Sequence, residues 1–394
     1  MSRSYSLFFT VLLSALPFAP AATAAPAMQL VAFAEIELAA PPDRSSWTTR
    51  ITGAAGEWRL HLEDDEGFQS ALTAASRAAL RRADGRWVRG EVAGRPGSWV
   101  RLSWYGGAWH GGFYDGETLY LIDPPESLSG LLPRQPETGA RALLYRFDDV
   151  IWPPLFDIAP IPPADGGGGR LAFPAFATHL NALAAGDLVQ LPVTLVSDTQ
   201  FSAIHGANST AVAASRVFFI DGIYSSQVGV SIGLHHHEIL NANGPLNSTN
   251  PQILIDQFRT FMISGAGTSI PRFQNRANAH LFTGRDLDGG VVGIAFLGVL
   301  CNQNVGFGID QNLNNATTAA LVFAHELGHN FGAPHDREMG SACETSNIAG
   351  IMNPSINGSQ QFSTCSIEQM QDDIANATCL AAVPEVIFSD GFES

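Results

Sequence analysis

The sequence contains no lysine, and its 21 basic residues, all arginine, are scattered among 37 acidic ones. The formal net charge is −16. Proteins that bind nucleic acid need clustered positive charge to neutralise phosphates, so we expect no nucleic-acid partner. The missing lysine and the abundant alanine and glycine are typical of a GC-rich bacterial genome, and we interpret them as a mark of origin and not of function.

Long apolar runs are also scarce. The first one, at residues 7–13, follows Arg3 and precedes small residues that end at Ala25. This order is typical of a secretory signal peptide, and the run is too short to span a membrane. Residues 291–300 are apolar too, but their length suits a buried strand. We therefore expect removal of residues 1–25, export to the extracellular side and no membrane span.

Cysteine is rare, and none occurs before Cys301. The four cysteines, all in the C-terminal third of the chain, are Cys301, Cys343, Cys365 and Cys379. An even number in an exported chain favours disulfides. Their spacing alone leaves every pairing possible.

Against these absences stands a dense run of metal-binding side chains at residues 325–335. The residues before His325 favour a helix, and side chains four apart on a helix share a face, so His325 and His329 can hold one metal. Glu326 lies beside that pair, where its carboxylate can reach a water on the metal without being a ligand. Gly332 stands where the helix must stop and turn, and the turn delivers His335 as the third ligand.

Three neutral imidazoles suit one catalytic zinc ion and leave a coordination position for water. Zinc lowers the pKa of such a water to about 7. Glu326 would then take the proton of that water and return it to the leaving amine, which is peptide hydrolysis without a covalent intermediate. Two histidines and a glutamate alone can arise on a solvated helix face. The longer pattern fixes five positions at set spacing and favours the catalytic zinc site.

The extended motif resembles that of the metzincin proteases, and Asp336 after the third histidine is similar to the adamalysin or reprolysin group in particular. Residues 350–354 resemble the Met-turn of that group, which implies that Met352 lies beneath zinc as an apolar floor. Residues 279–285 and 293–298 are similar to the edge-strand region of the group. By the resemblance, it would pair antiparallel with an extended protein or peptide substrate, through Gly293, Ile294, Ala295 and Phe296.

The same resemblance implies a disulfide pairing, Cys301 with Cys379 and Cys343 with Cys365. It also makes structural calcium doubtful, because Pro192 and Ala277 fall near the positions where the group carries carboxylates.

The chain divides into a sequence of expected parts after the signal peptide. Residues 26–160 contain alternating, aromatic-rich runs and predict a mainly antiparallel β domain that resembles a propeptide by position. Residues 161–186 are rich in proline and glycine and predict a linker or activation region. Residues 187–381 resemble the metzincin catalytic domain, which implies an α/β fold with a mixed sheet, helices and a zinc cleft between an upper and a lower part. Residues 382–394 form a tail without an indicated role.

Alternatives remain for both expected domains. Residues 26–160 could be a retained accessory β domain instead of a propeptide. As a propeptide, they would keep the enzyme latent sterically, since they contain no thiol to place on zinc. The C-terminal unit could be a non-catalytic adhesion or toxin module, which the intact Glu326 disfavours. It could also be a zinc hydrolase acting on another substrate, whereas the edge strand favours peptides. The sequence indicates neither side-chain specificity nor oligomeric state.

Overall fold

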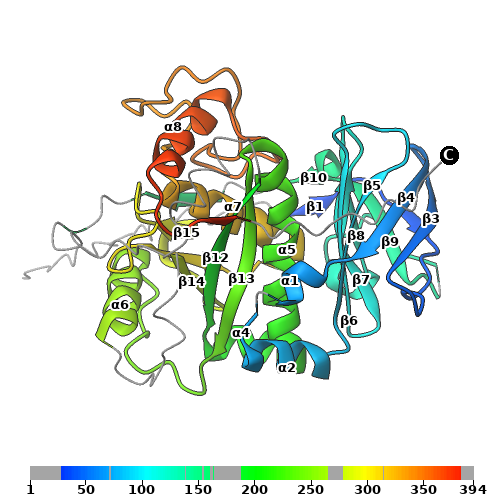
Figure 1. Cartoon of the computed structure of the whole chain (residues 1–394), viewed down its shortest axis with the longest axis horizontal. Helices are drawn as coiled ribbons and strands as arrows, with labels where there is room; N and C mark the ends of the chain where they lie inside the picture. The colour runs from blue at the N-terminus through cyan, green and yellow to red at the C-terminus, as the bar shows by residue number, and fades with distance from the viewer. Residues whose placement is uncertain are drawn as a thin grey trace, which may run out of the picture.

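A computed structural model describes residues 28–70, 72–137, 139–152, 155–159, 163, 188–264, 278–313 and 315–382. The expected signal peptide, nearly all of the linker and the tail from residue 383 lie outside these residues. Two β-sheets face each other across a long helix, α5 (Ser209–Gln227), in the middle of Figure 1. We call residues 28–152 the N-terminal unit and residues 188–382 the C-terminal unit.

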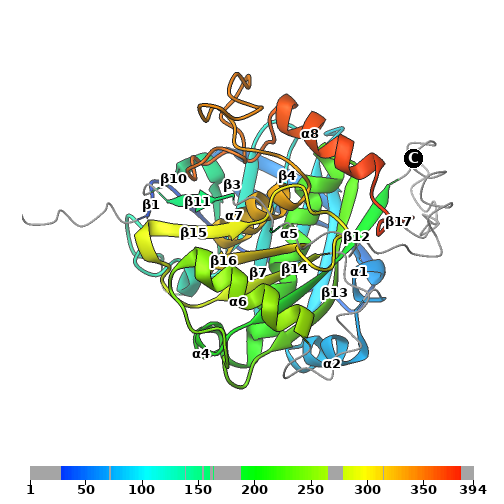
Figure 2. The same cartoon turned by 90° about the vertical axis from the view of Figure 1, so that its left-hand side faces the viewer.

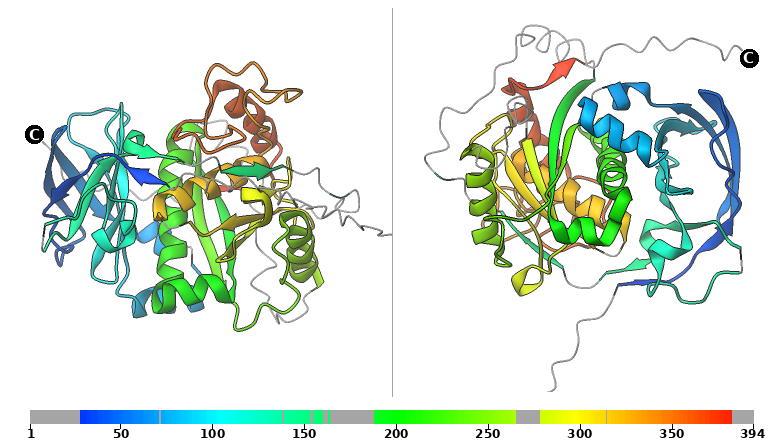
Figure 3. Two further views of the ribbon diagram at one scale, coloured as in Figure 1. Left: turned by 180° about the vertical axis from the view of Figure 1, so that it is seen from behind. Right: turned by 90° about the horizontal axis from the view of Figure 1, so that it is seen from below.

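An eight-stranded antiparallel sheet forms the body of the N-terminal unit, in the spatial order β2-β9-β8-β7-β6-β5-β4-β3. It curls strongly, as the right-hand view of Figure 3 shows, and its two ends approach each other. At this approach a Cβ added to Gly53 would lie 2.7 Å from the side chain of Leu144. Alternation along β4 turns Trp58, Leu60 and Leu62 into the core. The predicted β-rich N-terminal region is therefore confirmed.

The strands of this sheet are β2 (Ala34–Ile36), β3 (Ser46–Gly53), β4 (Gly56–Asp64), β5 (Arg86–Val92), β6 (Trp99–Tyr105), β7 (Ala108–Tyr114), β8 (Leu119–Asp123) and β9 (Ala142–Arg146). Two short strands, β1 (Gln29–Leu30) and β10 (Val150–Ile151), pair separately. The helical pieces are α1 (Glu66–Ser70), α2 (Ala74–Arg82), η1 (Pro125–Leu128) and η2 (Phe147–Asp149).

The C-terminal unit is built on a mixed sheet in the order β11-β15-β16-β14-β12-β13, with β17 beside β12. Its strands are β12 (Val189–Ser197), β13 (Val230–Ile239), β14 (Asn278–Thr283), β15 (Val291–Ala295), β16 (Phe307–Gln311) and β17 (Ala381–Ala382). The remaining strand, β11 (Phe156–Ile158), comes from the segment that follows the N-terminal unit. A mixed sheet with helices is the α/β class that the sequence predicts.

Helices cover both faces of this sheet (Figure 2). Helices α5 and α7 (Ala316–Asn330) pack on one face, and α6 (Pro251–Ser264) packs on the other. The helical spacing of Leu254, Phe258, Phe261 and Met262 predicts one buried face for this helix, and all four side chains are buried. The other helices are α4 (Thr199–His205), η4 (Gly206–Asn208), η6 (Asp288–Gly290) and α8 (Thr364–Ala375). No helix among the described residues is long and apolar enough to cross a membrane.

Helix α5 joins the two units because it is buried on all sides. Every residue from Ser209 to Tyr224 is buried. One face packs on β13, and the opposite face packs on β6 and β7 of the N-terminal sheet. Inside that second contact, Asp221 forms an ion pair of 2.7 Å with Arg101. Asp221 also accepts hydrogen bonds from the Ser231 hydroxyl and the Ile232 amide.

Three details differ from the expectations. The sequence predicts a strand over residues 227–234, but helix α5 continues to Gln227, and strand β13 begins at Val230, after Gly229 turns the chain at φ +78°. Residues 278–283, expected near the sheet edge, form the interior strand β14 because both β12 and β16 pair with them. Strand β15 ends at Ala295, so Phe296 lies just beyond it, although its amide still donates to Phe307.

The disulfides are Cys301–Cys379 and Cys343–Cys365, which confirms the expected pairing. Both lie within the C-terminal unit, so no disulfide among the described residues links it to the N-terminal unit.

Removing one partner of the buried ion pair should destabilise the whole chain. We expect Asp221→Ala to lower the free energy of unfolding by about 3–5 kcal/mol, because the guanidinium of Arg101, whose side chain is only 13% exposed, would lose its carboxylate. Urea unfolding measures the change. The control is Glu57→Ala, which removes the pair between Arg50 and Glu57, whose side chains are 60% and 55% exposed; it should cost less than about 1 kcal/mol. Equal costs for the two variants would contradict a linking role for Asp221.

Candidate metal centre

Helix α7 positions the predicted metal ligands. It begins at an N-cap in which the Asn315 side chain accepts from the amide of Thr318 at 2.8 Å. It ends just before Gly332, whose φ of +96° turns the chain. A Cβ at this glycine would lie 2.3 Å from a carboxylate oxygen of Asp373, so a larger residue would displace that carboxylate as well as strain the backbone. The turn brings His335 back beside the helix, as the spacing predicts.

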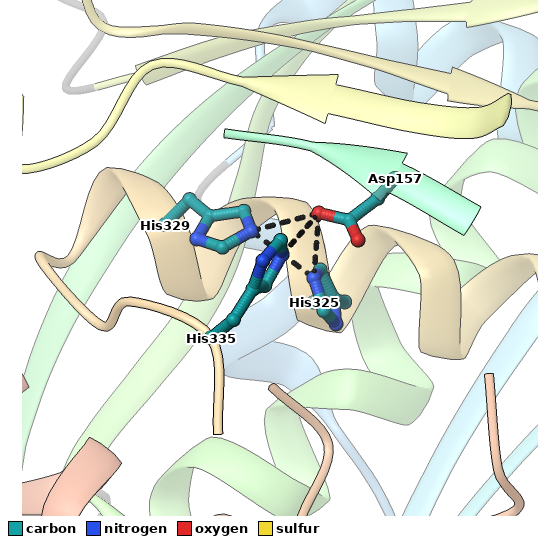
Figure 4. Close-up of side chains that lie close together, drawn as sticks. All are labelled: Asp157, His325, His329 and His335. Carbon is teal, nitrogen blue, oxygen red and sulfur yellow. Dashed lines mark hydrogen bonds and ion pairs between the residues drawn. The ribbon is translucent and has the colours of Figure 1, made fainter. Parts of the chain in front are cut away.

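The three histidines converge on a single point, and a fourth side chain meets them there (Figure 4). The Nε2 atoms of His325, His329 and His335 lie 2.9, 2.9 and 2.8 Å from Oδ2 of Asp157. Nε2 of His325 is 3.0 Å from Nε2 of His329. Among the described residues these four are the one group of at least three such side chains placed to hold a metal.

The outer nitrogen of each imidazole is held by an acceptor. Nδ1 of His325 lies 2.6 Å from the Ile351 carbonyl oxygen, and Nδ1 of His329 lies 2.8 Å from that of Ala333. Nδ1 of His335 lies 2.7 Å from a carboxylate oxygen of Glu338. Each Nδ1 must therefore donate its proton outward, which leaves the Nε2 lone pairs facing the centre.

A cation at the centre would explain why these acceptor atoms lie so close together. Three Nε2 acceptors and the Asp157 carboxylate would otherwise meet with no hydrogen between them. Protonated imidazoles could also supply hydrogens, but burial lowers the pKa of His329 to about 4 and disfavours that form for this ring. The pKa of His335 moves the other way, because Asp157 and Glu338 outweigh its burial. A cation satisfies all three rings at once. Three imidazoles and one carboxylate are a donor set that zinc prefers. The residues present thus fit the metal that the motif predicts.

Asp157 is the functional residue that the sequence analysis missed. It lies on β11, where burial alone would raise its pKa, yet the three surrounding imidazoles, His325 first, hold that pKa well below its usual range and keep the side chain a carboxylate. Asp157 is one of 37 acidic residues, and its only local signal is its place between the apolar Phe156 and Ile158. The pairing of β11 with β15 brings it to the histidines.

Glu326 belongs to α7, and its side chain points to β15 and is completely buried. Neither of its carboxylate oxygens has a hydrogen-bond partner among the described residues. Burial, together with repulsion from Asp157 and Asp310, raises its pKa well above the usual range. A Cβ added to Gly293 would lie 1.9 Å from Oε1 of Glu326, so this carboxylate rests directly against the backbone of β15.

Met352 and Asp336 lie near the histidines, and each is in close contact with a glycine. Met352 is buried, and a Cβ on Gly328 of α7 would lie 2.5 Å from its sulfur, so Met352 supports the helix from beneath. The Asp336 carboxylate accepts from the Gly350 amide at 3.0 Å and from the Ser363 hydroxyl at 2.6 Å. A Cβ on Gly350 would lie 2.6 Å from Asp336, which leaves space only for glycine.

The predicted substrate edge is covered in this structure. Strand β15 pairs antiparallel with β16 on one side and parallel with β11 on the other. The edge is therefore occupied by the chain itself at Val291, Gly293 and Ile294, in the direction opposite to the one expected for a substrate.

Comparison with known proteins agrees with this geometry. Residues 189–363 match the family described as Metallo-peptidase family M12. The chain is also similar to the human protein "Disintegrin and metalloproteinase domain-containing protein 9", with 28% identity over 207 residues. That alignment covers 48% of this chain and 23% of the human protein. These matches support a zinc-dependent metalloprotease of the adamalysin or reprolysin type in the C-terminal unit.

The contact between Gly293 and Glu326 predicts a sharp size limit on β15. We expect Gly293→Ala to displace the Glu326 carboxylate, to lower the free energy of unfolding by about 1–3 kcal/mol and to reduce peptide hydrolysis. Urea unfolding and a fluorogenic peptide assay measure the two effects. Gly67→Ala is the control, because its Cβ would come no closer than 3.3 Å to a neighbouring atom. Unchanged hydrolysis in Gly293→Ala would show that Glu326 does not depend on this contact.

Proposed function

We propose that the protein is an exported zinc endopeptidase made as a latent precursor. The observation that carries the proposal is the convergence of three Nε2 lone pairs beside Glu326, directly under an edge strand suited to a peptide. The family match supports the metallopeptidase class. Glu326 as general base, the export and the latency are our inferences.

The chemistry divides between the metal and the side chains. Zinc, when bound, supplies Lewis acidity toward the scissile carbonyl and the attacking water. His325, His329 and His335 hold it, and their outward hydrogen bonds fix the orientation of each ring. Glu326 accepts the proton of the water and passes it to the leaving amine. No residue forms a covalent bond to the substrate.

The backbone of β15 would orient the substrate. Its outer edge, through Gly293 and Ala295, offers amide and carbonyl groups to an extended peptide, which would be added as another strand. This favours proteins and peptides over smaller molecules as substrates. The intact set of ligands and base favours an enzyme over an adhesion module.

The latency rests on the occupied edge. Strand β11 fills the place of a substrate, and it belongs to the segment between the N-terminal unit and the linker. We propose that residues 26–160 keep the enzyme inactive and that cleavage within residues 161–186 activates it, with Arg170 as one candidate site.

Glu326 should be required for turnover but not for metal binding. We expect Glu326→Gln, in chain cleaved within the linker, to retain one zinc per chain and to lose peptide hydrolysis by at least about 10²–10⁴-fold. Zinc content and cleavage of a fluorogenic peptide are measured on the same sample. The matched control, Glu344→Gln, changes an exposed glutamate and should keep full activity. Appreciable turnover by Glu326→Gln would contradict the general-base role.

A further inference from the structure

We propose that Asp157 is the fourth zinc ligand of the precursor, and that β11 presents it in a direction that protects the strand from cleavage. The inference rests on the proposed function and extends it, because it identifies the group that replaces the water. Without a thiol anywhere before Cys301, the chain uses a carboxylate for this purpose.

The Asp157 carboxylate lies in the centre of the three histidines. Oδ2 of Asp157 lies within 2.9 Å of all three Nε2 atoms, so its position is shared equally among the histidines. A catalytic zinc site keeps one position open, whereas four protein ligands close it. With Asp157 in place, the open position is filled, and water cannot enter beside Glu326.

Strand β11 runs parallel to β15. Asp157 is in register with Gly293 and Ile158 with Ile294, in a parallel pair. The family resemblance implies that a substrate runs antiparallel to β15. The backbone of β11 therefore passes the metal in reverse, so its peptide groups do not match the order of carbonyl and amine that Glu326 serves. The strand can occupy the cleft without being cut.

Residues 355–358 contact β11 and its flanking residues on the side opposite to β15. The segment after the Met-turn closes over β11, since the Ile356 amide donates to the Leu155 carbonyl at 3.0 Å and Phe156 bridges Ser355. Just upstream, Trp152 packs so closely on Gly358 that a Cβ there would lie 2.7 Å from its Nε1. β11 is thus clamped between β15 and residues 355–358, which holds Asp157 at the metal.

The test uses full-length chain loaded with cobalt(II), whose visible absorption reports the ligands directly. We expect wild-type chain to show a spectrum that azide leaves unchanged. Asp157→Ala should show an altered spectrum and should bind azide, because an open position replaces the carboxylate. Its zinc should also pass to a chelator at least about tenfold faster, as loss of metal-site contacts typically weakens binding by that factor or more.

Two further variants keep the test decisive. Asp148→Ala removes an exposed carboxylate upstream of β11 and should behave as wild type. Asp157→Asn preserves the shape of the side chain, should fold normally by circular dichroism, and should still hold zinc less tightly than wild type. Identical cobalt spectra and azide responses in wild type and Asp157→Ala would overturn the proposal. Peptide hydrolysis after linker cleavage is scored separately, so an inactive enzyme would refute the endopeptidase function and leave the ligand result standing.

Helix α5 supports a second, independent inference: the N-terminal unit stays bound to the C-terminal unit after the linker is cut. The outer face of α5 packs on aromatic side chains of the N-terminal unit. The ring of Phe218 lies 5.0 Å from that of Phe68, and the ring of Phe219 lies 5.9 Å from that of Trp99. A Cβ on Gly222 would lie 2.6 Å from Trp99.

Loss of the N-terminal unit would expose this apolar face and separate Asp221 from Arg101. A helix that is buried on every side is not suited to a surface position. Activation is therefore local. Cutting the linker frees the downstream end of β11, which leaves the cleft while the curled sheet remains on α5.

The experiment uses full-length Glu326→Gln, which prevents self-digestion, with a site for a specific protease placed within residues 164–186. After the cut, size-exclusion chromatography in native buffer should give one peak containing both fragments, at the elution volume of the uncut chain. In denaturant, which removes the apolar contacts, the fragments should separate. Separate elution in native buffer would overturn the inference.

Discussion

The meeting of four acceptor atoms at one buried point is the constraint on which the rest of the structure depends. Three Nε2 atoms and Oδ2 of Asp157 lie within hydrogen-bond distance, yet each imidazole already donates its proton to an outer acceptor. Such a cluster is unfavourable unless a cation lies at its centre. The surrounding fold serves to aim these atoms and to keep water from them.

The orientation of these atoms depends on glycine residues at four close contacts. Gly332 turns the chain to return His335, and Gly328 leaves space for the sulfur of Met352 beneath the helix. Gly293 lets the Glu326 carboxylate lie directly against β15, and Gly350 admits the carboxylate of Asp336. Each of these contacts fixes a distance between two elements that meet at the centre, so the geometry of the site is set by packing as well as by the ligands themselves.

Much of this could be predicted from the sequence because the information is local. The ligands of α7 follow from helical spacing, and the turn at Gly332 follows from the need for a positive φ. The disulfides followed from the family resemblance. Asp157 could not be predicted, because a carboxylate far along the chain reaches the histidines only through the pairing of β11 with β15. The burial of α5 on all sides was equally hidden, since it depends on a second sheet that packs from the N-terminal unit.

The two units meet in one structure. The N-terminal sheet packs on α5, and the segment that leaves this sheet pairs with β15 beside the histidines. In the precursor that we propose, latency would arise from a specific ligand delivered by a specific strand register, and its release would need movement of only a short segment.

A crystal structure of the full-length, zinc-loaded chain, with diffraction data collected at the zinc absorption edge, tests the central claim most directly. The account predicts one anomalous peak enclosed by the Nε2 atoms of His325, His329 and His335, with an oxygen of Asp157 as the fourth ligand and β11 parallel to β15. A peak at another place, or a zinc ion that carries water while Asp157 points away from it, would contradict the account.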